Sequence, residues 1–382
     1  MDQSHQSPGP DEVSRRVLPL NTYFTLYQLS RSVFGLSIMP ATAPLRIYDI
    51  IAKNDLPSRL TLLKSIPVHF DEAYSEEELW KVHDDYMEVY REYKRRIYSG
   101  KEKHKANAAE KNLFDLKIAI AERIIENCHL CHHRCGVNRK RGDKGFCRST
   151  DSSFYASEFI HMGEEPEIVP SHTIFFSGCV LSCVYCQNWD ISMYPGTGKK
   201  VEPVELARIV EKRRSKGAKN LNLVTPTPHL HNIFRILEEV NSNIPVVWQS
   251  NMYHSFEAGK LLEGVVDVFL ADFKYGNNEC ALRYSKVEEY METVTSNMAY
   301  AGKDAEILMR HLVIPGHVEC CTRKVIEWTS KNIPKVRFNL MFQYRPEYLA
   351  CMYPEINKYV GPEEKQKAIK MTKDAGLIDV LF

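Results

Sequence analysis

The second half of the chain alternates short apolar runs with longer helical patterns, and this order limits the folds that it can adopt. Strands are predicted near residues 173–177, 220–225, 245–250, 265–271, 306–313 and 335–342, and helices near residues 202–216, 229–240, 255–263, 280–300, 320–331 and 362–375. Six strand-then-helix units imply a parallel sheet with right-handed crossovers. The almost continuously apolar strands suit a sheet that is buried on both faces. We therefore predict an α/β fold, a partial (β/α)6 TIM-like barrel with parallel strands. A doubly wound open sheet is the alternative.

Polar side chains gather where these strands end. Ligands of parallel α/β sheets bind at the C-terminal ends of the strands. Those ends carry Thr225 and Thr227, Ser250 and Asn251, Asp272 and Lys274, and Arg310. The pattern therefore predicts a binding site at one rim of the sheet. Asp272 and Lys274 point to the same side of their strand, so they can hold one ligand together or form an ion pair with each other.

Three cysteines follow the first predicted strand with the spacing C-x3-C-x2-C. They are Cys179, Cys183 and Cys186, which we call the loop cysteines. Three thiolates at this spacing can hold an iron–sulfur cluster and leave one iron free. Buried structural thiols are the alternative, because a free cysteine often behaves as a small apolar residue. Three cysteines within eight positions, opened by Gly178, are hard to explain by packing, and we favour the cluster.

Several stretches together resemble one enzyme superfamily. Residues 177–188 and 222–227, the Asp272-Phe-Lys274 stretch and residues 310–316 resemble the radical S-adenosylmethionine (SAM) superfamily. Within it they resemble the branch related to pyruvate formate-lyase activating enzyme that has a cysteine-rich lead-in. The resemblance covers roughly residues 128–350.

This resemblance implies a radical SAM oxidoreductase with a 4Fe-4S cluster and S-adenosyl-L-methionine as cofactors. In the superfamily, reductive cleavage of SAM at the cluster gives a 5′-deoxyadenosyl radical that abstracts hydrogen from a substrate. The expected partners are a reductant such as ferredoxin or flavodoxin and, for an activating-enzyme type, a protein substrate. The alternatives are modification of a peptide, tRNA or small molecule, and a non-catalytic iron–sulfur protein.

The resemblance also assigns SAM contacts residue by residue. Tyr185 takes the place of an aromatic residue near the adenine, and Arg310 that of an arginine near the SAM carboxylate. Asp272 and Lys274 match the ribose contacts. Thr225 and Thr227 stand where the family has a Gly-Gly-Glu-like stretch for the SAM amino group, and Ser250 and Asn251 replace a more acidic segment.

Four further cysteines precede the barrel. Cys128, Cys131, Cys135 and Cys147, the upstream cysteines, offer four thiolates with glycines between them. They predict a second metal centre that holds zinc, iron or an auxiliary iron–sulfur cluster. Histidines in this segment can replace a thiolate, although histidines beside cysteines more often lie outside the ligand set. The remaining cysteines, Cys280, Cys320, Cys321 and Cys351, show no ligand spacing and are expected to be core or surface thiols.

The predicted organisation has three parts. Residues 1–127 form a mostly helical extension, of which roughly the first 15 residues are expected to be disordered. A helix is predicted from a capping box at Ser75–Glu78, and a second one over residues 106–126. Residues 128–170 form a cysteine-rich metal-binding segment, and residues 171–382 form the barrel.

Composition limits the binding partners and the cellular compartment that we expect for the protein. The chain has 382 residues and a formal net charge of +1, which gives no overall field that favours nucleic acid or a membrane surface. No apolar run approaches the roughly 18 residues that span a bilayer, and the start lacks a signal-peptide pattern. Eleven cysteines in such a chain indicate metal ligation in a reducing compartment. We therefore expect a cytoplasmic protein.

Overall fold

A computed structural model describes residues 45–105 and 109–382, which belong to one compact unit of the chain, residues 43–382. The disorder expected for the first residues and the helical character expected before residue 45 lie outside the described residues. Among the helices of the described part, none combines the length and the apolar character that crossing a membrane requires.

A nine-stranded sheet forms the centre of the described unit. Its order is β3-β1-β2-β4-β5-β6-β7-β8-β9. The strands are β1 (Phe154–His161), β2 (Ser171–Phe176), β3 (Lys199–Lys200), β4 (Asn220–Val224), β5 (Val246–Ser250), β6 (Val268–Asp272), β7 (Glu306–Leu312), β8 (Arg337–Met341) and β9 (Val380–Leu381). All neighbours from β2 to β9 pair in parallel, whereas β1 and β3 are antiparallel.

The predicted α/β fold with a mostly parallel sheet is confirmed. The six predicted strands correspond to β2 and β4 to β8. The sheet stays open, because β3 and β9 stand at its two ends and do not pair with each other. β1 was not expected as a strand. It lies in the stretch interpreted as a cysteine-rich segment, and most of its residues are only partly buried.

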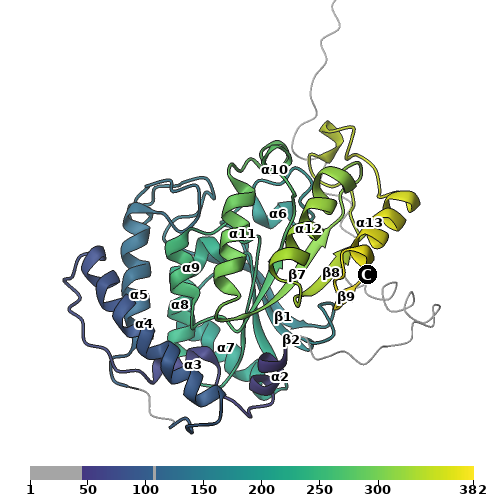
Figure 1. The fold of residues 1–382 in the computed structure, drawn as a ribbon. Coiled ribbons are helices and arrows are strands. Elements are labelled where there is room, and N and C mark those ends of the chain that lie inside the picture. The colour runs from purple at the N-terminus through teal and green to yellow at the C-terminus, as the bar shows by residue number, and fades with distance from the viewer. Residues whose placement is uncertain (1–44, 106–108) are drawn as a thin grey trace, which may run out of the picture. The chain divides into compact units, whose positions relative to one another are not determined.

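Helices follow the parallel strands, as the alternation predicted. They are α6 (Trp189–Ser192), α7 (Pro203–Ser215), α8 (Leu230–Glu239), α9 (Phe256–Leu262), α10 (Asn278–Ser285), α11 (Tyr290–Ala301), α12 (Arg323–Asn332) and α13 (Pro362–Asp374). A π-helical turn, Val318–Thr322, leads into α12. Figure 1 shows α8, α9, α11 and α12 along one face of the strands. The predicted helix over residues 280–300 is divided into α10 and α11, because Lys286 and Glu289 between them adopt left-handed backbone angles.

The amino-terminal helices pack outside this layer. They are α3 (Arg59–Lys64), α4 (Glu76–Tyr98) and α5 (Leu113–Ile124), whereas the first helix, α2 (Arg46–Ala52), packs against one end of the sheet. The expected capping box between Ser75 and Glu78 starts α4. α5 begins at Leu113, later than the predicted residue 106, because Asn112 and Asp115 form a second capping box there. α5 contacts α8 and α9, so these helices continue the outer layer of the barrel.

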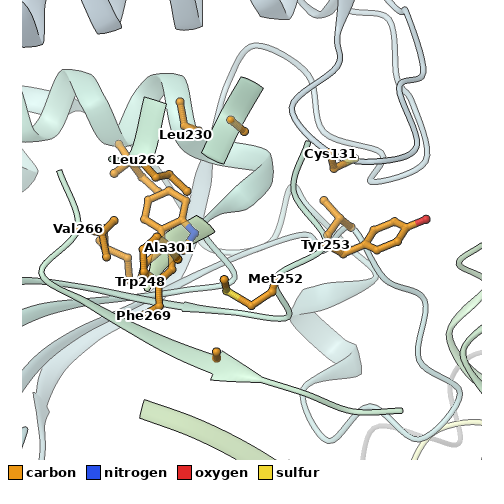
Figure 2. Close-up of a cluster of buried hydrophobic side chains, with 14 of the residues drawn as sticks. Cys131, Leu230, Trp248, Met252, Tyr253, Leu262, Val266, Phe269 and Ala301 are labelled. Atoms are coloured by element: carbon orange, nitrogen blue, oxygen red, sulfur yellow. The ribbon is translucent and has the colours of Figure 1, made fainter. Parts of the chain in front are cut away.

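The main core lies between the sheet and the helices. Trp248 on β5 is fully buried and is surrounded by apolar side chains, among them Leu262, Val266, Phe269 and Ala301 (Figure 2). Every second residue of the strands faces this layer, since side chains alternate along a strand. The residues between them face the concave side of the sheet.

The concave side is filled at its lower end. A second apolar cluster there joins Leu45, Tyr48, Ile168, Val247, Val268, Leu270 and Leu308. Glu306 on β7 accepts hydrogen bonds from the backbone N–H groups of Ile47 and Tyr48 and so ties α2 to this end. The β1–β2 connection, residues 162–170, contributes Ile168. We call this closed end the floor of the barrel, and the open end with the C-terminal ends of the strands its mouth.

Candidate functional site

The loop cysteines follow β2 at the mouth of the barrel. All three are free thiols. Gly178, directly before Cys179, has φ +107°, and an added Cβ would meet Pro195 and Ser149 at 3.0 Å. Glycine is therefore required for the chain to leave β2 in this direction. Burial raises the pKa of the Cys183 thiol to about 11.

Each loop cysteine has a hydrogen-bonding group at its sulfur. The Leu181 amide and the Asn251 side chain lie 3.4 and 3.6 Å from the sulfur of Cys179. The Ser285 hydroxyl donates to Cys183 Sγ over 2.9 Å, and the Ser192 hydroxyl lies 3.2 Å from Cys186 Sγ. Such donors stabilise thiolates and adjust the potential of a cluster that they bind.

A chain of hydroxyl groups connects Tyr185 with the loop. The Tyr185 hydroxyl donates to that of Tyr275 over 2.8 Å, and Tyr275 lies 2.6 Å from the Ser285 hydroxyl. Ser285 in turn contacts Cys183. Tyr185 is 6% exposed, so its ring is largely buried beside the loop where the resemblance expects an aromatic residue.

Asp272 and Lys274 come together at the end of β6. Lys274 Nζ lies 2.9 Å from Asp272 Oδ2, so the ion pair considered as the alternative forms. About a quarter of each side chain is exposed, 23% and 26%, which leaves both within reach of a ligand. Burial disfavours the charged form of Lys274, but Asp272 and Cys183 outweigh it and raise the Lys274 pKa. Lys274 therefore stays positively charged beside the loop cysteines.

Arg310 lies inside the barrel against two carboxylates. It binds Glu165 with two hydrogen bonds, at 2.7 and 2.6 Å, and also contacts Glu164. Asn339 on β8 donates to Glu165, and Asn222 on β4 lies 3.3 Å from Glu164. Since β4 and β8 are separated by three strands, both can reach this pair of glutamates only from the concave side. A ligand carboxylate would have to share Arg310 with them.

The remaining predicted contacts stand at the same rim. Thr225 adopts φ +55°, a costly conformation for a β-branched residue and one that clusters at functional sites. Thr227 is buried in the turn that follows. The Ser250 hydroxyl accepts the Met252 amide over 3.2 Å, and Asn251 accepts the Tyr253 amide while it donates to Cys179. The rim thus gathers the residues that the strand ends predicted. Their roles toward SAM stay predictions.

The upstream cysteines lie beside the loop. Cys128, Cys131 and Cys147 are buried and Cys135 is exposed. Cys131 lies next to Tyr253 (Figure 2). His133 Nε2 lies 2.9 Å from the carbonyl oxygen of Val180, the residue that follows Cys179. Backbone amides approach their sulfur atoms, including that of Phe146 at 3.3 Å from Cys135 Sγ. The segment thus places thiols that have nearby amide donors next to the loop cysteines.

Two groups were missed from the sequence. Cys280, Cys320 and Cys321 were expected to be separate thiols, but their sulfur atoms lie within 4.8 Å of one another. No spacing rule finds them, because Cys280 and Cys320 are 40 positions apart in the sequence. Glu164 and Glu165 lie in the connection before β2, whereas the rule for parallel sheets predicts ligands after strands.

The residues present fit a four-iron cluster with one open iron. The loop supplies three thiols, and each has a polar neighbour. The loop contains no fourth cysteine, so three irons of the cluster would have a thiolate ligand and one would not. In the described part of the chain, neither the loop nor the upstream cysteines contain a trio as close as 4.8 Å. A cluster holds its thiolates on separate irons and so keeps them farther apart than one ion does. The polar rim of β4 to β7 can hold a small polar cofactor next to it.

The family comparison agrees with this chemistry. Residues 173–329 match the family model of the radical SAM superfamily. The uncharacterized protein MJ0674 of Methanocaldococcus jannaschii is 43% identical over 343 residues, which cover 88% of this chain and 98% of that protein.

Two solved structures align with about half of the chain. Streptococcus suis SuiB bound to S-adenosylmethionine is 12% identical, with a TM-score of 0.40, and the match covers 51% of this chain and 44% of SuiB. The match thus spans under half of SuiB. TYW1 with a lysine–pyruvate adduct bound is 14% identical, with a TM-score of 0.34, over 53% of this chain and 73% of TYW1.

Proposed function

The chain belongs to the radical SAM superfamily, and from this premise we propose that it abstracts hydrogen from a protein substrate, as activating enzymes do. A cluster bound by the loop cysteines supplies the electron that cleaves SAM. The single observation that supports this proposal best is the convergence of three hydrogen-bonded thiols with the polar strand ends at one mouth.

The residues of the mouth have separable tasks in this proposal. The Asp272–Lys274 pair accepts and donates hydrogen bonds to the ribose hydroxyl groups, which are charge-assisted and therefore strong. Tyr185 provides an apolar face for the adenine, and its own hydroxyl is already satisfied by Tyr275. Asn251, directly after β5, donates to the sulfur of Cys179 and so orients it.

A protein substrate is supported by the surface around the loop. The segment after β8 packs on the loop through a hydrogen bond from the Leu349 amide to the Val184 carbonyl, 2.9 Å long. Trp189 stacks on Tyr348, with ring centroids 5.3 Å apart. Beside them Tyr194, Leu349 and Met352 are exposed by 55%, 43% and 73%. Exposed aromatic residues and methionine next to a site are typical of protein-binding surfaces.

The upstream cysteines have a place in the same proposal. They contact the loop through His133, so a metal centre there lies where it can pass an electron toward the loop or help to hold the substrate. An iron–sulfur cluster suits the first task and zinc suits only the second. Metal analysis of a variant without these cysteines separates the two.

The experiment measures 5′-deoxyadenosine from reduced full-length protein and SAM. Wild type is expected to release it, and the variant with all three loop cysteines replaced by alanine is expected to lose both the cluster absorption and this product. Cys351→Ala is the matched control, because Cys351 is an exposed cysteine outside the loop. Cleavage that persists in the triple variant would overturn the assignment.

The substrate part of the proposal is tested separately. Cell extract is screened for a protein that raises 5′-deoxyadenosine yield and acquires a radical signal in electron paramagnetic resonance. Leu349→Ser with Met352→Ser should weaken this response while cleavage without substrate persists, whereas Ile378→Ser, a change at another exposed apolar residue, should not. A response that only small-molecule fractions evoke would contradict a protein substrate.

A further inference from the structure

A third group of thiols stands apart from the loop and the upstream cysteines. Cys280 lies in the first turn of α10, and Cys320 and Cys321 lie in the π-helical turn before α12. Their three sulfur atoms lie within 4.8 Å of one another, and all three cysteines are free. These elements follow the neighbouring strands β6 and β7, which explains how residues far apart in sequence meet.

A histidine lies beside this group. The His317 side chain interacts with the Cys280 thiol, while the set of ligand atoms within 4.8 Å of one another consists of the three sulfur atoms. Its Nδ1 lies 2.8 Å from the Pro315 carbonyl, and because a carbonyl only accepts, Nδ1 carries the proton and donates. The lone pair of Nε2 is then available. A histidine that binds a metal typically donates its other N–H to a carbonyl or carboxylate in this way.

The surroundings hold the thiols close together. An added Cβ at Gly276 would lie 2.4 Å from the Cys321 carbonyl oxygen, so only glycine allows the chain after β6 to approach the π-helical turn. The Asn277 side chain donates to the Cys320 carbonyl over 2.8 Å and lies 3.5 Å from Cys321 Sγ. This amide donor suits a charged thiolate.

We propose that Cys280, Cys320, Cys321 and His317 bind one zinc ion. Three cysteines and one histidine are a known donor set of structural zinc sites, and tetrahedral geometry with Zn–S distances of about 2.3 Å spaces the sulfur atoms by about 3.8 Å. Sulfur atoms within 4.8 Å need only small adjustments to reach it. On binding, the three thiols lose their protons to solvent, and no redox step is involved.

The ion would brace a helix of the radical site. It joins the start of α10 to the turn before α12, and the other end of α10 carries Ser285, whose hydroxyl donates to Cys183 Sγ. The site therefore fixes the position of one hydrogen-bond donor to the loop cysteines without taking part in the chemistry.

The test is zinc analysis of full-length protein purified without oxygen and supplied with zinc. The upstream cysteines are replaced by serine throughout, so that their site cannot mask the result. In this background, Cys280→Ser with Cys321→Ser should remove one zinc per chain and leave the iron and sulfide content unchanged. Cys351→Ser should change nothing. His317→Ala removes one of the four ligands and should lower zinc affinity by more than the roughly ten- to hundredfold that loss of a partner beside a ligand costs, whereas His317→Cys should retain the ion.

Thiol labelling keeps the test independent of how well the variants fold. In the protein with its native cysteines, Cys320, which is partly exposed, should react with a maleimide only after a chelator removes zinc, while exposed Cys351 reacts in both cases. Equal labelling with and without the chelator would overturn the proposal. So would unchanged zinc content in the double variant, or a disulfide between Cys280 and Cys321 in mass spectra of the zinc-supplied protein.

Discussion

Arg310 and its two glutamates offer the sharpest test of how the barrel interior is held together. Arg310→Met removes the guanidinium group and leaves two carboxylates whose side chains are 5% and 2% exposed. Removing one partner of a buried ion pair costs about 3–5 kcal/mol, because the remaining charge stays buried without compensation. The variant is therefore expected to lose about this much of the free energy of unfolding.

The pKa of Glu164 supports the same magnitude. Burial favours its neutral form, but Arg310 and His161 outweigh burial and lower the pKa from 4.5 to about 2. A fall of this size corresponds to about 3 kcal/mol of stability at neutral pH. Because the folded pKa lies below the unfolded one, this contribution is present above about pH 4.5 and is lost as the pH falls toward 2.

A neutral triple variant separates charge from packing. Arg310→Met combined with Glu164→Gln and Glu165→Gln buries no charge in this group, so it should recover most of the stability that the single variant loses, and its stability should no longer fall between pH 4.5 and 2 through Glu164. Urea denaturation over this pH range measures both effects. Arg323→Met is the control, because its pair with Glu319 is exposed and worth at most about 1 kcal/mol.

Two results would refute this account of the interior. One is a loss of less than about 1 kcal/mol in Arg310→Met, the range of an exposed pair. The other is a triple variant that is no more stable than the single one. Either would mean that Arg310 is held by something other than the charges of the two glutamates.

Three further predictions concern the mouth. Asp272→Ala and Lys274→Ala should each weaken SAM binding roughly ten- to hundredfold in calorimetric titration, with the cluster spectrum unchanged; normal affinity with a lowered melting temperature would assign the pair to stability alone. Replacing the upstream cysteines with alanine should remove one metal centre and keep the loop cluster, and metal analysis of wild type that accounts for a single cluster only would contradict this second centre. Ser285→Ala removes the hydroxyl that donates to Cys183 and should make the cluster potential more negative in a redox titration, whereas Ser285→Thr should keep it; an unchanged potential in the alanine variant would show that this hydrogen bond does not act on the cluster.

The parallel strands could be predicted because burial on both faces leaves almost continuous apolar runs. β6 shows this well, since all but its last residue are buried. β1 could not be predicted in the same way. It is an antiparallel strand near the sheet edge whose residues are mostly half-exposed, and its sequence carries no comparable run. The break between α10 and α11 was equally hidden, because Lys286 and Glu289 are not the residues that usually mark a left-handed turn.

The residues of the candidate site were predictable only where they directly follow a single strand in the sequence. The loop cysteines and Asp272 with Lys274 follow single strands, and spacing within one stretch reveals them. The group of Cys280, Cys320 and Cys321 depends on two connections that are brought side by side by the pairing of β6 and β7. Spacing along one stretch of sequence does not reveal such a contact. Glu164 and Glu165 enter the barrel from its floor, where the rule about strand ends does not apply.

The closed floor has a consequence for the order of events in catalysis. Ile168 and Tyr48 fill the lower end of the barrel, and the Asn220 side chain bonds to the Tyr48 hydroxyl and the Ile168 carbonyl over 2.7 and 2.6 Å. A small molecule in the lumen and a large one across the mouth must therefore use the same passage. With the protein substrate proposed above, the small molecule has to arrive first and depart last, so steady-state kinetics should follow a compulsory order in which excess protein substrate traps 5′-deoxyadenosine inside the enzyme.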